Sequence, residues 1–261
     1  MLTVKAALAR GHITTWAGTT RVWASERGVR EVKLPDWHRG MPQDARDEAR
    51  IVIEVECGTA ADAHLSRALR ELAEFYAGRR REFTLALDPE GAPFYQEIWA
   101  EVARVPYGET RSYGEIARAV ATVEASRAVG AANGANPVAP FVPCHRIVGS
   151  DGKLTGYGPG LPLKQRLLVM EDAVPASTAD YPDWARRMVA RYGENVLLGV
   201  RGAGVYCRPD CARERPQRLL PGRVFRSAEE ARAAGFAPCP ACRPDSERAT
   251  TGVEQASLFV G

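Results

Sequence analysis

Two closely spaced pairs of cysteines constrain the fold of this chain more than any other feature. Cys207 and Cys211 are separated by three residues, Cys239 and Cys242 by two, and 27 residues lie between the pairs. Such spacing lets four thiolates converge on one ion, as in a tetrathiolate zinc site. Four reduced thiols in an apolar core are the alternative, but they do not account for the paired spacing. The pattern therefore predicts a small module that one Zn²⁺ holds together.

The length and composition of the chain allow more than one folded unit. Its 261 residues, 45% of them hydrophobic, suffice for two domains with apolar cores. Six cysteines in such a chain favour metal binding or catalysis over a disulfide framework, and the isolated Cys57 is expected to be structural. No apolar run reaches the length of a membrane span. A soluble, monomeric, cytoplasmic protein is expected.

Positive charge is concentrated in two parts of the chain, although the net charge is only +3. Residues 101–170 hold eight Lys and Arg against five Asp and Glu, and residues 181–245 hold twelve Arg against seven acids. Residues 1–100 are nearly neutral, with fourteen bases and fifteen acids. A surplus of arginine often marks only a solvated surface, but this distribution also suits a protein that binds nucleic acid phosphates.

Residues 1–88 have the pattern of a small α/β domain with a supporting role. Apolar residues recur at helical spacing from Leu65 to Tyr76, and Gly78 follows as a stop. No residue with evident chemistry occurs here. The runs with β character, which predict an antiparallel sheet, are His12–Trp16, Arg21–Ala24, Val29–Leu34 and Ile51–Val55.

Residues 89–173 have a mainly helical pattern that begins at Pro93. Ser112 and Glu115 fit a capping box, so a helix should start near Tyr113. A second helix is expected from about Glu124 to Gly134, and the pair suggests a winged-helix-like helix-turn-helix. The many small residues of the second helix suit either close approach to another surface or tight internal packing.

The remaining elements divide the C-terminal half of the chain. A helix is expected to start at Pro162, a favoured first-turn residue. Residues 174–180 have no periodicity and are expected to be a linker, residues 181–246 to form the zinc-stapled α+β module, and residues 247–261 to be a flexible tail. The predicted fold class is therefore α/β, in three units.

The sequence Pro143-Cys144-His145-Arg146 places a thiol beside an imidazole. A neighbouring base or cation favours the ionised, nucleophilic form of a cysteine. Pro143 and the upstream Pro137 stiffen the backbone around the thiol. A buried structural cysteine next to an incidental histidine is the alternative that the pair alone would favour.

The longer context of this pair resembles O6-alkylguanine-DNA alkyltransferases, which move an alkyl group from guanine to their own cysteine. Asn136-Pro137-Val138 and Val142-Pro143-Cys144-His145-Arg146 carry the resemblance. It covers roughly residues 1–173 and is strong between about 94 and 171. Further matching segments are Val105–Thr110, Ser112-Tyr113, Ser126–Gly130, Gly156-Tyr157, Lys164, Leu167-Leu168 and Glu171.

The resemblance implies a role for several residues in the transfer itself. His145 would draw the proton from Cys144 through a bridging water, and Glu171 would orient the imidazole. Asn136 would shape the turn that presents the thiol. Tyr157 and Lys164 would hydrogen-bond the base or the leaving oxygen.

The resemblance also implies binding to double-stranded DNA through the minor groove, with the target nucleotide flipped into a pocket. Tyr113 would crowd the target phosphate, and Arg127 would fill the space that the base leaves. The residues expected to contact DNA are Tyr113, Arg127, Ala128, Ala131, Arg146, Tyr157 and Lys164.

The cysteine module resembles the Ada-type zinc domain, in segments such as Gly204–Cys211 and Cys242–Asp245. The resemblance implies that Cys207 is both a zinc ligand and the acceptor of a methyl group from a DNA phosphotriester. Two departures stand against this role: Gly202–Val205 differs from the usual Thr-Thr-Gly-Ile, and Glu214 replaces an expected phosphate-binding arginine. The module also follows the alkyltransferase part instead of preceding it, and no further reader domain is expected.

The last residues contain Gln-x-Ser-Leu-Phe at Gln255–Phe259, which resembles the peptide that bacterial repair proteins use to bind the sliding clamp. An apolar tail packed on its own domain is the alternative.

Taken together, these patterns favour a single-turnover DNA repair methyltransferase, associated with the nucleoid. Three other classes stay open: a lesion-binding protein without transfer activity, a zinc-dependent transcription regulator, and a thiol hydrolase. The intact Cys144 counts against a lesion-binding protein, and the expected lack of a reader domain counts against a transcription regulator. The adjacency of cysteine and histidine counts against a thiol hydrolase.

Overall fold

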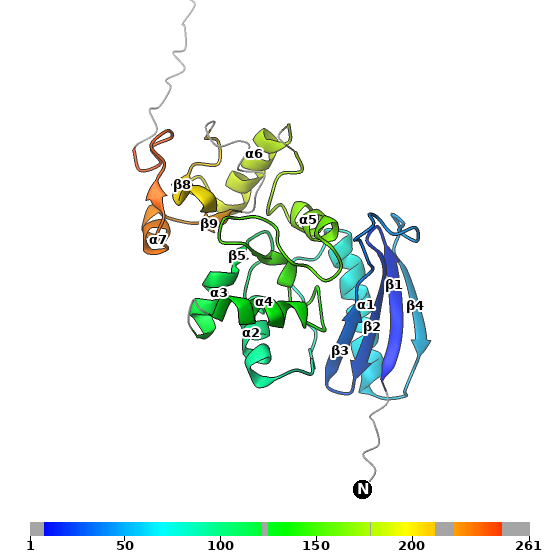
Figure 1. Cartoon of the computed structure of the whole chain (residues 1–261). Coiled ribbons are helices and arrows are strands. Elements are labelled where there is room, and N and C mark those ends of the chain that lie inside the picture. Colours follow the sequence, from blue (N-terminus) through cyan, green and yellow to red (C-terminus); the bar gives the residue numbers. More distant parts are fainter. Residues whose placement is uncertain (1–7, 122–124, 178, 212–221, 247–261) are drawn as a thin grey trace, which may run out of the picture.

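The computed structural model describes residues 8–121, 125–177, 179–211 and 222–246. Three α/β units follow one another along these residues (Figure 1). The predicted clamp peptide Gln255–Phe259, the residue Glu214 and the expected helix start at Glu124 lie outside the described residues.

The N-terminal unit is a four-stranded antiparallel sheet with a helix on one face. The strands are ordered β3-β2-β1-β4, and α1 (Ala60–Tyr76) packs on β1 and β2. The Thr59 side chain caps α1 by accepting the N–H of Ala61. The predicted sheet and helix are confirmed, although the helix starts before its first large apolar residue. The strands are β1 (Ala9–Thr15), β2 (Gly18–Ser25), β3 (Gly28–Lys33) and β4 (Arg50–Val55).

The middle unit is mainly helical. Its elements are α2 (Pro93–Ala103), β5 (Arg111–Ser112), α3 (Tyr113–Val120), α4 (Ser126–Gly134), η2 (Cys144–Arg146), β6 (Ile147–Val148) and α5 (Leu161–Met170). The expected capping box is present, because Ser112 Oγ accepts the N–H of Glu115 and the Ser112 N–H donates to the Glu115 carboxylate. Helices α2, α3 and α4 pack against one another, and β5 pairs with β6 in parallel.

One continuous apolar core joins the N-terminal and middle units. It runs from Ile13 in the sheet through Leu72 and Ile98 to Val129 and Leu167. Main-chain contacts also cross between the units, since the Val32 N–H donates to the Pro137 carbonyl at 2.6 Å. The boundary expected near residue 88 therefore does not separate two cores.

The C-terminal unit has its own small sheet, ordered β10-β8-β7-β9. Its elements are α6 (Tyr181–Tyr192), β7 (Leu197–Val200), η3 (Arg201–Ala203), β8 (Val205–Cys207), β9 (Arg223–Phe225), α7 (Ala228–Ala233) and β10 (Ala237–Pro238). Helix α6 buries Tyr181, Trp184 and Met188 against Leu198 of β7 and Val224 of β9. Val174, at the start of the expected linker, is buried beside Leu168 of α5.

None of the helices in the described residues is long and apolar enough to cross a membrane.

Candidate functional site

Asn136 holds the turn that carries Cys144. Its amide nitrogen donates to the Val142 carbonyl at 2.8 Å and to the Cys144 sulfur at 3.2 Å, while its amide oxygen accepts the N–H of Val138 at 3.1 Å. These three hydrogen bonds from one side chain join Val138, at the start of the loop, to Val142 and Cys144 at its end. Cys144 then starts the short 3₁₀ turn η2, directly before β6. The thiol is therefore presented from a stiff backbone and is 6% exposed.

His145, Arg146 and Glu171 form a buried charged network behind the thiol. The His145 Nε2 and a Glu171 carboxylate oxygen lie 2.9 Å apart, and Arg146 donates to both carboxylate oxygens at 2.9 Å. A third Arg146 nitrogen donates to the Val105 carbonyl at 2.6 Å. Arg146 was expected to contact DNA, but its guanidinium is buried and occupied by protein partners. In this structure Arg146 holds Glu171, and its contact with DNA stays a prediction.

The electrostatics of the network favour a neutral imidazole beside an ionised carboxylate. Burial lowers the pKa of His145, although Glu171 opposes this effect. Burial would raise the pKa of Glu171, but the Arg146 guanidinium and His145 hold it at about 2. The carboxylate therefore fixes the Nε2–H tautomer of His145 and leaves Nδ1 as the basic nitrogen. This nitrogen is buried and has no hydrogen-bond partner among the described residues.

The thiol itself keeps its proton in the resting protein. Burial raises the pKa of Cys144 by more than the Asn136 hydrogen bond and the Lys164 charge lower it. The Cys-His pair suggested an ionised thiol, and the structure corrects this expectation, because the neighbouring imidazole is neutral and supplies no positive charge. The proton has to leave Cys144 at the time of reaction.

Cys144 lines a pocket of about 430 Å³ that lies beside α4. Tyr113 at the start of α3, Gly130 of α4 and Tyr157 of the loop before α5 contribute to its wall. The Tyr157 hydroxyl is buried without a hydrogen-bond partner among the described residues, and burial raises its pKa well above 10. It is therefore a protonated donor available to a polar ligand. A pocket of this size accommodates a nucleobase.

The N-terminal unit supplies part of this wall, which the sequence analysis missed. Val32 of β3 and the following Leu34 line the pocket together with residues of the middle unit. The Trp37 N–H also donates to the Pro159 carbonyl at 2.7 Å, which fixes the loop after Tyr157. Only the pairing of β3 with the rest of the fold brings these residues to the site, and no local sequence pattern signals it.

Lys164 is fully buried and binds backbone carbonyls. Its ammonium donates to the carbonyls of Ile147 at 2.6 Å and Thr155 at 2.8 Å, so it ties β6 to the loop before Tyr157. Burial lowers its pKa to about 8. Contact between Lys164 and a base, as the resemblance implied, stays a prediction.

The outward side of helix α4 carries small residues apart from Arg127. Val129 and Ala132 are buried, whereas Arg127 and Ala131 are exposed and Ala128 is half-buried. A Cβ added at Gly130 or Gly134 would meet nothing within 4 Å. The two glycines therefore face open space and are not required by packing inside the protein.

The four paired cysteines come together in the C-terminal unit. Cys207 ends β8, Cys239 follows β10, and all four sulfurs lie within 4.8 Å of one another. Four thiolates around a tetrahedral Zn²⁺ with bonds of about 2.3 Å have this spacing. The residues present thus fit the predicted tetrathiolate site. Cys207, Cys211 and Cys239 are buried, and Cys242 is partly exposed.

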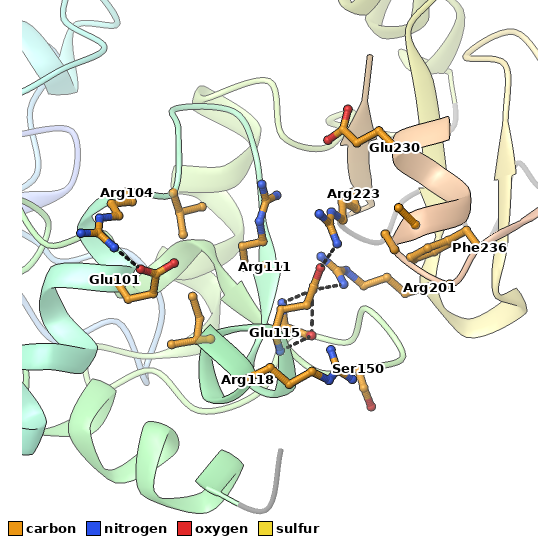
Figure 2. A pocket seen from close by; sticks show the side chains of 16 residues that line it. Glu101, Arg104, Arg111, Glu115, Arg118, Ser150, Arg201, Arg223, Glu230 and Phe236 are labelled. Atoms are coloured by element: carbon orange, nitrogen blue, oxygen red, sulfur yellow. Dashed lines mark hydrogen bonds and ion pairs between the residues drawn. The ribbon is translucent and has the colours of Figure 1, made fainter. Parts of the chain in front are cut away.

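A cleft of about 790 Å³ lies between the middle and C-terminal units. Figure 2 shows Glu115 between two arginines of the C-terminal unit, Arg201 and Arg223. Arg223 binds one carboxylate oxygen at 2.8 Å, and Arg201 binds the other, which also accepts the Ser112 N–H. Glu115, which completes the capping box of α3, therefore also anchors the zinc unit.

A cysteine thiol next to a histidine–carboxylate pair, in a base-sized pocket beside a helix with small residues, is the arrangement expected of a protein that accepts a group on cysteine. Residues 93–173 match the family model for the 6-O-methylguanine DNA methyltransferase DNA binding domain, and residues 185–245 match that for the metal binding domain of Ada. The chain belongs to the family of methylated-DNA–protein-cysteine methyltransferases. The resemblances drawn from both sets of motifs, and the mixed α/β class, are confirmed.

Individual relatives show the extent of the similarity. A methylated-DNA–protein-cysteine methyltransferase of Mycolicibacterium paratuberculosis is 52% identical over 104 residues, which are 40% of this chain and 63% of the relative. One from Methanosarcina acetivorans is 50% identical over 104 residues, 40% of this chain and 67% of the relative. The chain thus aligns with about two thirds of the length of these curated relatives.

Solved structures cover a larger part of the chain. The crystal structure of Mycobacterium tuberculosis OGT in complex with DNA is 35% identical, with a TM-score of 0.50, over 62% of this chain and 91% of that chain. The Mycobacterium tuberculosis O6-methylguanine methyltransferase is 33% identical, also with a TM-score of 0.50, over 66% of this chain and 98% of that chain.

Proposed function

We propose that this protein repairs DNA by transferring the alkyl group of O6-alkylguanine irreversibly to Cys144. One observation carries the proposal: Glu171 binds His145, the neighbour of a thiol that lines a base-sized pocket. This is an arrangement of orienting carboxylate, base and nucleophile. The similarity to a structure solved with DNA supports double-stranded DNA as the partner.

The target base has to leave the duplex to reach the pocket. In this proposal the exposed Arg127 of α4 enters the base stack, and the small residues Ala128, Ala131 and Gly130 let the helix approach the minor groove closely. Tyr113, at the start of α3, crowds the backbone of the flipped nucleotide. Helices α3 and α4 act together as a helix-turn-helix in this proposal.

In the transfer step the Cys144 sulfur attacks the alkyl carbon. His145 Nδ1 takes the thiol proton through a bridging water, the S–C bond forms and the C–O6 bond breaks. The electron pair of the broken bond stays with guanine, and the proton taken from Cys144 returns from the imidazolium through water to guanine N1. Tyr157 donates a hydrogen bond to the base as negative charge develops. The thioether product is stable, so each molecule reacts once.

Intact-protein mass spectrometry after incubation with DNA carrying O6-methylguanine tests this function. The wild type and Cys57→Ala should each gain one methyl group, and Cys144→Ala should gain none. Folded, zinc-loaded wild type that forms no adduct but binds the lesion would overturn the transfer function and favour lesion binding without chemistry.

The zinc unit supports a second transfer, from a methylphosphotriester in DNA to Cys207. Zinc bound by four cysteines keeps their thiolates ionised and nucleophilic. The new S–C bond would replace the bond between the methyl carbon and a phosphate oxygen, which leaves as the phosphodiester anion. Cys207 is 0% exposed, so the reaction requires that its sulfur become accessible on DNA.

Peptide mapping after incubation with methylphosphotriester DNA locates this methyl group without altering a zinc ligand. Methylation of the peptide holding Cys207 is expected. A methyl group on the partly exposed Cys242, or none in zinc-loaded protein, would reject Cys207 as the acceptor.

The C-terminal Gln255–Phe259 segment is proposed to bind the sliding clamp, with a site of action at the nucleoid. Deleting residues 255–261 should abolish clamp pull-down and leave the alkyl transfer rate unchanged. Clamp binding by the truncated protein would reject the motif.

A further inference from the structure

The C-terminal end of α5 is closed by side chains from the zinc unit. A helix ends with carbonyls that have no partner within the helix. Here the Glu171 carbonyl accepts from Arg191 of α6 at 3.1 Å, and the Asp172 carbonyl accepts from the Trp184 indole, also of α6, at 2.8 Å. Helix α6 therefore caps α5 from outside, and the capped residue is the carboxylate that orients His145.

The backbone after Glu171 depends on these contacts. Asp172 has a φ of 58°, in the left-handed region that a residue with a Cβ adopts only with support from its surroundings. Its carboxylate binds Arg187 at 2.9 Å, so three side chains of α6 hold two consecutive residues. Without them the turn at residues 171–172 has no other donors to its carbonyls among the described contacts.

Arg191 also reaches the opposite side of the network. A second guanidinium nitrogen binds the Tyr107 carbonyl, and the guanidinium lies 5.2 Å from the centre of the Tyr107 ring. The segment it holds includes Val105, which accepts from Arg146, and Gly108, whose N–H faces the Glu171 carboxylate at 3.4 Å. A Cβ at Gly108 would lie 2.6 Å from the Glu171 carbonyl oxygen and would also collide with Arg191. Gly108, the Glu171 carbonyl and Arg191 are therefore closely packed.

We propose that Arg191, carried by the zinc unit, is a positioning residue for the reaction at Cys144 and acts through Glu171. The inference rests on the proposed alkyl transfer. By joining the Glu171 and Tyr107 carbonyls, Arg191 sets the distance between the two segments that hold the Glu171 carboxylate. Without these two hydrogen bonds of Arg191, the carboxylate moves relative to His145. The imidazole is then less firmly kept in the tautomer with a basic Nδ1. The zinc unit is thereby part of the Cys144 site.

The test compares Arg191→Ala with Arg186→Ala in the full-length, zinc-loaded protein. Arg186 lies on the same helix, its side chain is 78% exposed, and within the described residues its ion pair is with Asp183. Single-turnover transfer from O6-methylguanine DNA should be about tenfold slower in Arg191→Ala, with unchanged DNA affinity, and unaltered in Arg186→Ala. Arg191→Lys, which keeps a donor, should recover part of the rate.

A second readout is independent of transfer. The ¹⁵N chemical shifts of the His145 ring report which nitrogen carries the proton, and Arg191→Ala should show a larger share of the Nδ1–H tautomer than the wild type. Arg191→Met, which keeps the stem packed on Tyr107, replaces the alanine variant if that variant does not fold.

Wild-type rate and wild-type ring shifts in the Arg191 variants would overturn the positioning role. If the wild type forms no adduct, the proposed function fails, and the ring shifts still decide whether Arg191 positions the network.

Discussion

At the scale of residues, burial sets the protonation state of each group in the site. Cys144, His145 and Glu171 are all at most 6% exposed, yet only Glu171 is charged at neutral pH, because Arg146 compensates it. His145 stays neutral because its desolvation outweighs the attraction of the carboxylate. The neutral thiol and neutral base avoid two uncompensated charges in the interior until a substrate arrives.

The transfer rate should depend on pH through His145. Its pKa lies below the ordinary 6.5, so the imidazole remains a base as pH falls through 6.5, and the rate declines only at lower pH. Single-turnover rates measured from roughly pH 5 to pH 8 would show this acid limb. A midpoint above 6.5 would contradict the assignment of neutral His145 as the base.

Glu171→Gln should destabilise the protein by about 3–5 kcal/mol at neutral pH, because it leaves the Arg146 charge buried and unpaired. The Glu171 pKa is about 2 in the folded protein against 4.5 without these partners, so its contribution is complete above pH 4.5 and is lost as pH falls towards 2. Urea unfolding of both proteins should show a stability difference that narrows over this range. A difference that is constant with pH would contradict the linkage.

At the scale of elements, α4 combines a buried inner face with an outer face that carries small residues apart from Arg127. Its inner residues Val129 and Ala132 join the main core, so the helix stays in place when the outer face changes. Sequence patterns predicted this helix and its small residues, but could not separate internal packing from an open surface. That distinction depends on which neighbouring elements approach the helix.

Gly130→Leu should weaken DNA binding about tenfold, because a large side chain would block close approach to the groove. The fold should persist, since a Cβ there meets nothing within 4 Å. Gly130→Ala is the matched control and should raise stability by about 0.5–1 kcal/mol through its helix propensity. Fluorescence anisotropy with duplex DNA and thermal unfolding would measure the two effects. Unchanged affinity in Gly130→Leu would exclude this face from the interface.

At the scale of the whole molecule, two separately patterned parts of the chain meet beside the Cys144 site. The zinc unit contacts the middle unit at both sides of the site, through Glu115 at the start of α3 and through Glu171 at the end of α5. Its own core is small, with α6 packed on a short sheet. Such a unit depends on its metal for a stable fold.

Zinc removal should therefore slow transfer to Cys144 several-fold, although no zinc ligand lies in the Cys144 pocket. Chelation followed by single-turnover kinetics would measure the effect, with near-ultraviolet circular dichroism as a readout of α6 packing. Restored zinc should recover the rate, and Cys57→Ala should respond as the wild type does. A zinc-free protein that loses its C-terminal fold and still reacts at the full rate would show that the units are independent.

The amino-acid sequence alone determined the local and chemical features of this protein. Periodicity and capping residues indicated the sheet, the helices and the start of α3, and cysteine spacing indicated the metal site, because these signals act over a few residues. Only the tertiary structure decided that Arg146 faces inward, that Val32 and Leu34 line the pocket, and that Arg191 caps the helix ending at Glu171. Each depends on elements far apart in the chain packing together, where burial and hydrogen-bond demand select partners that no local pattern specifies.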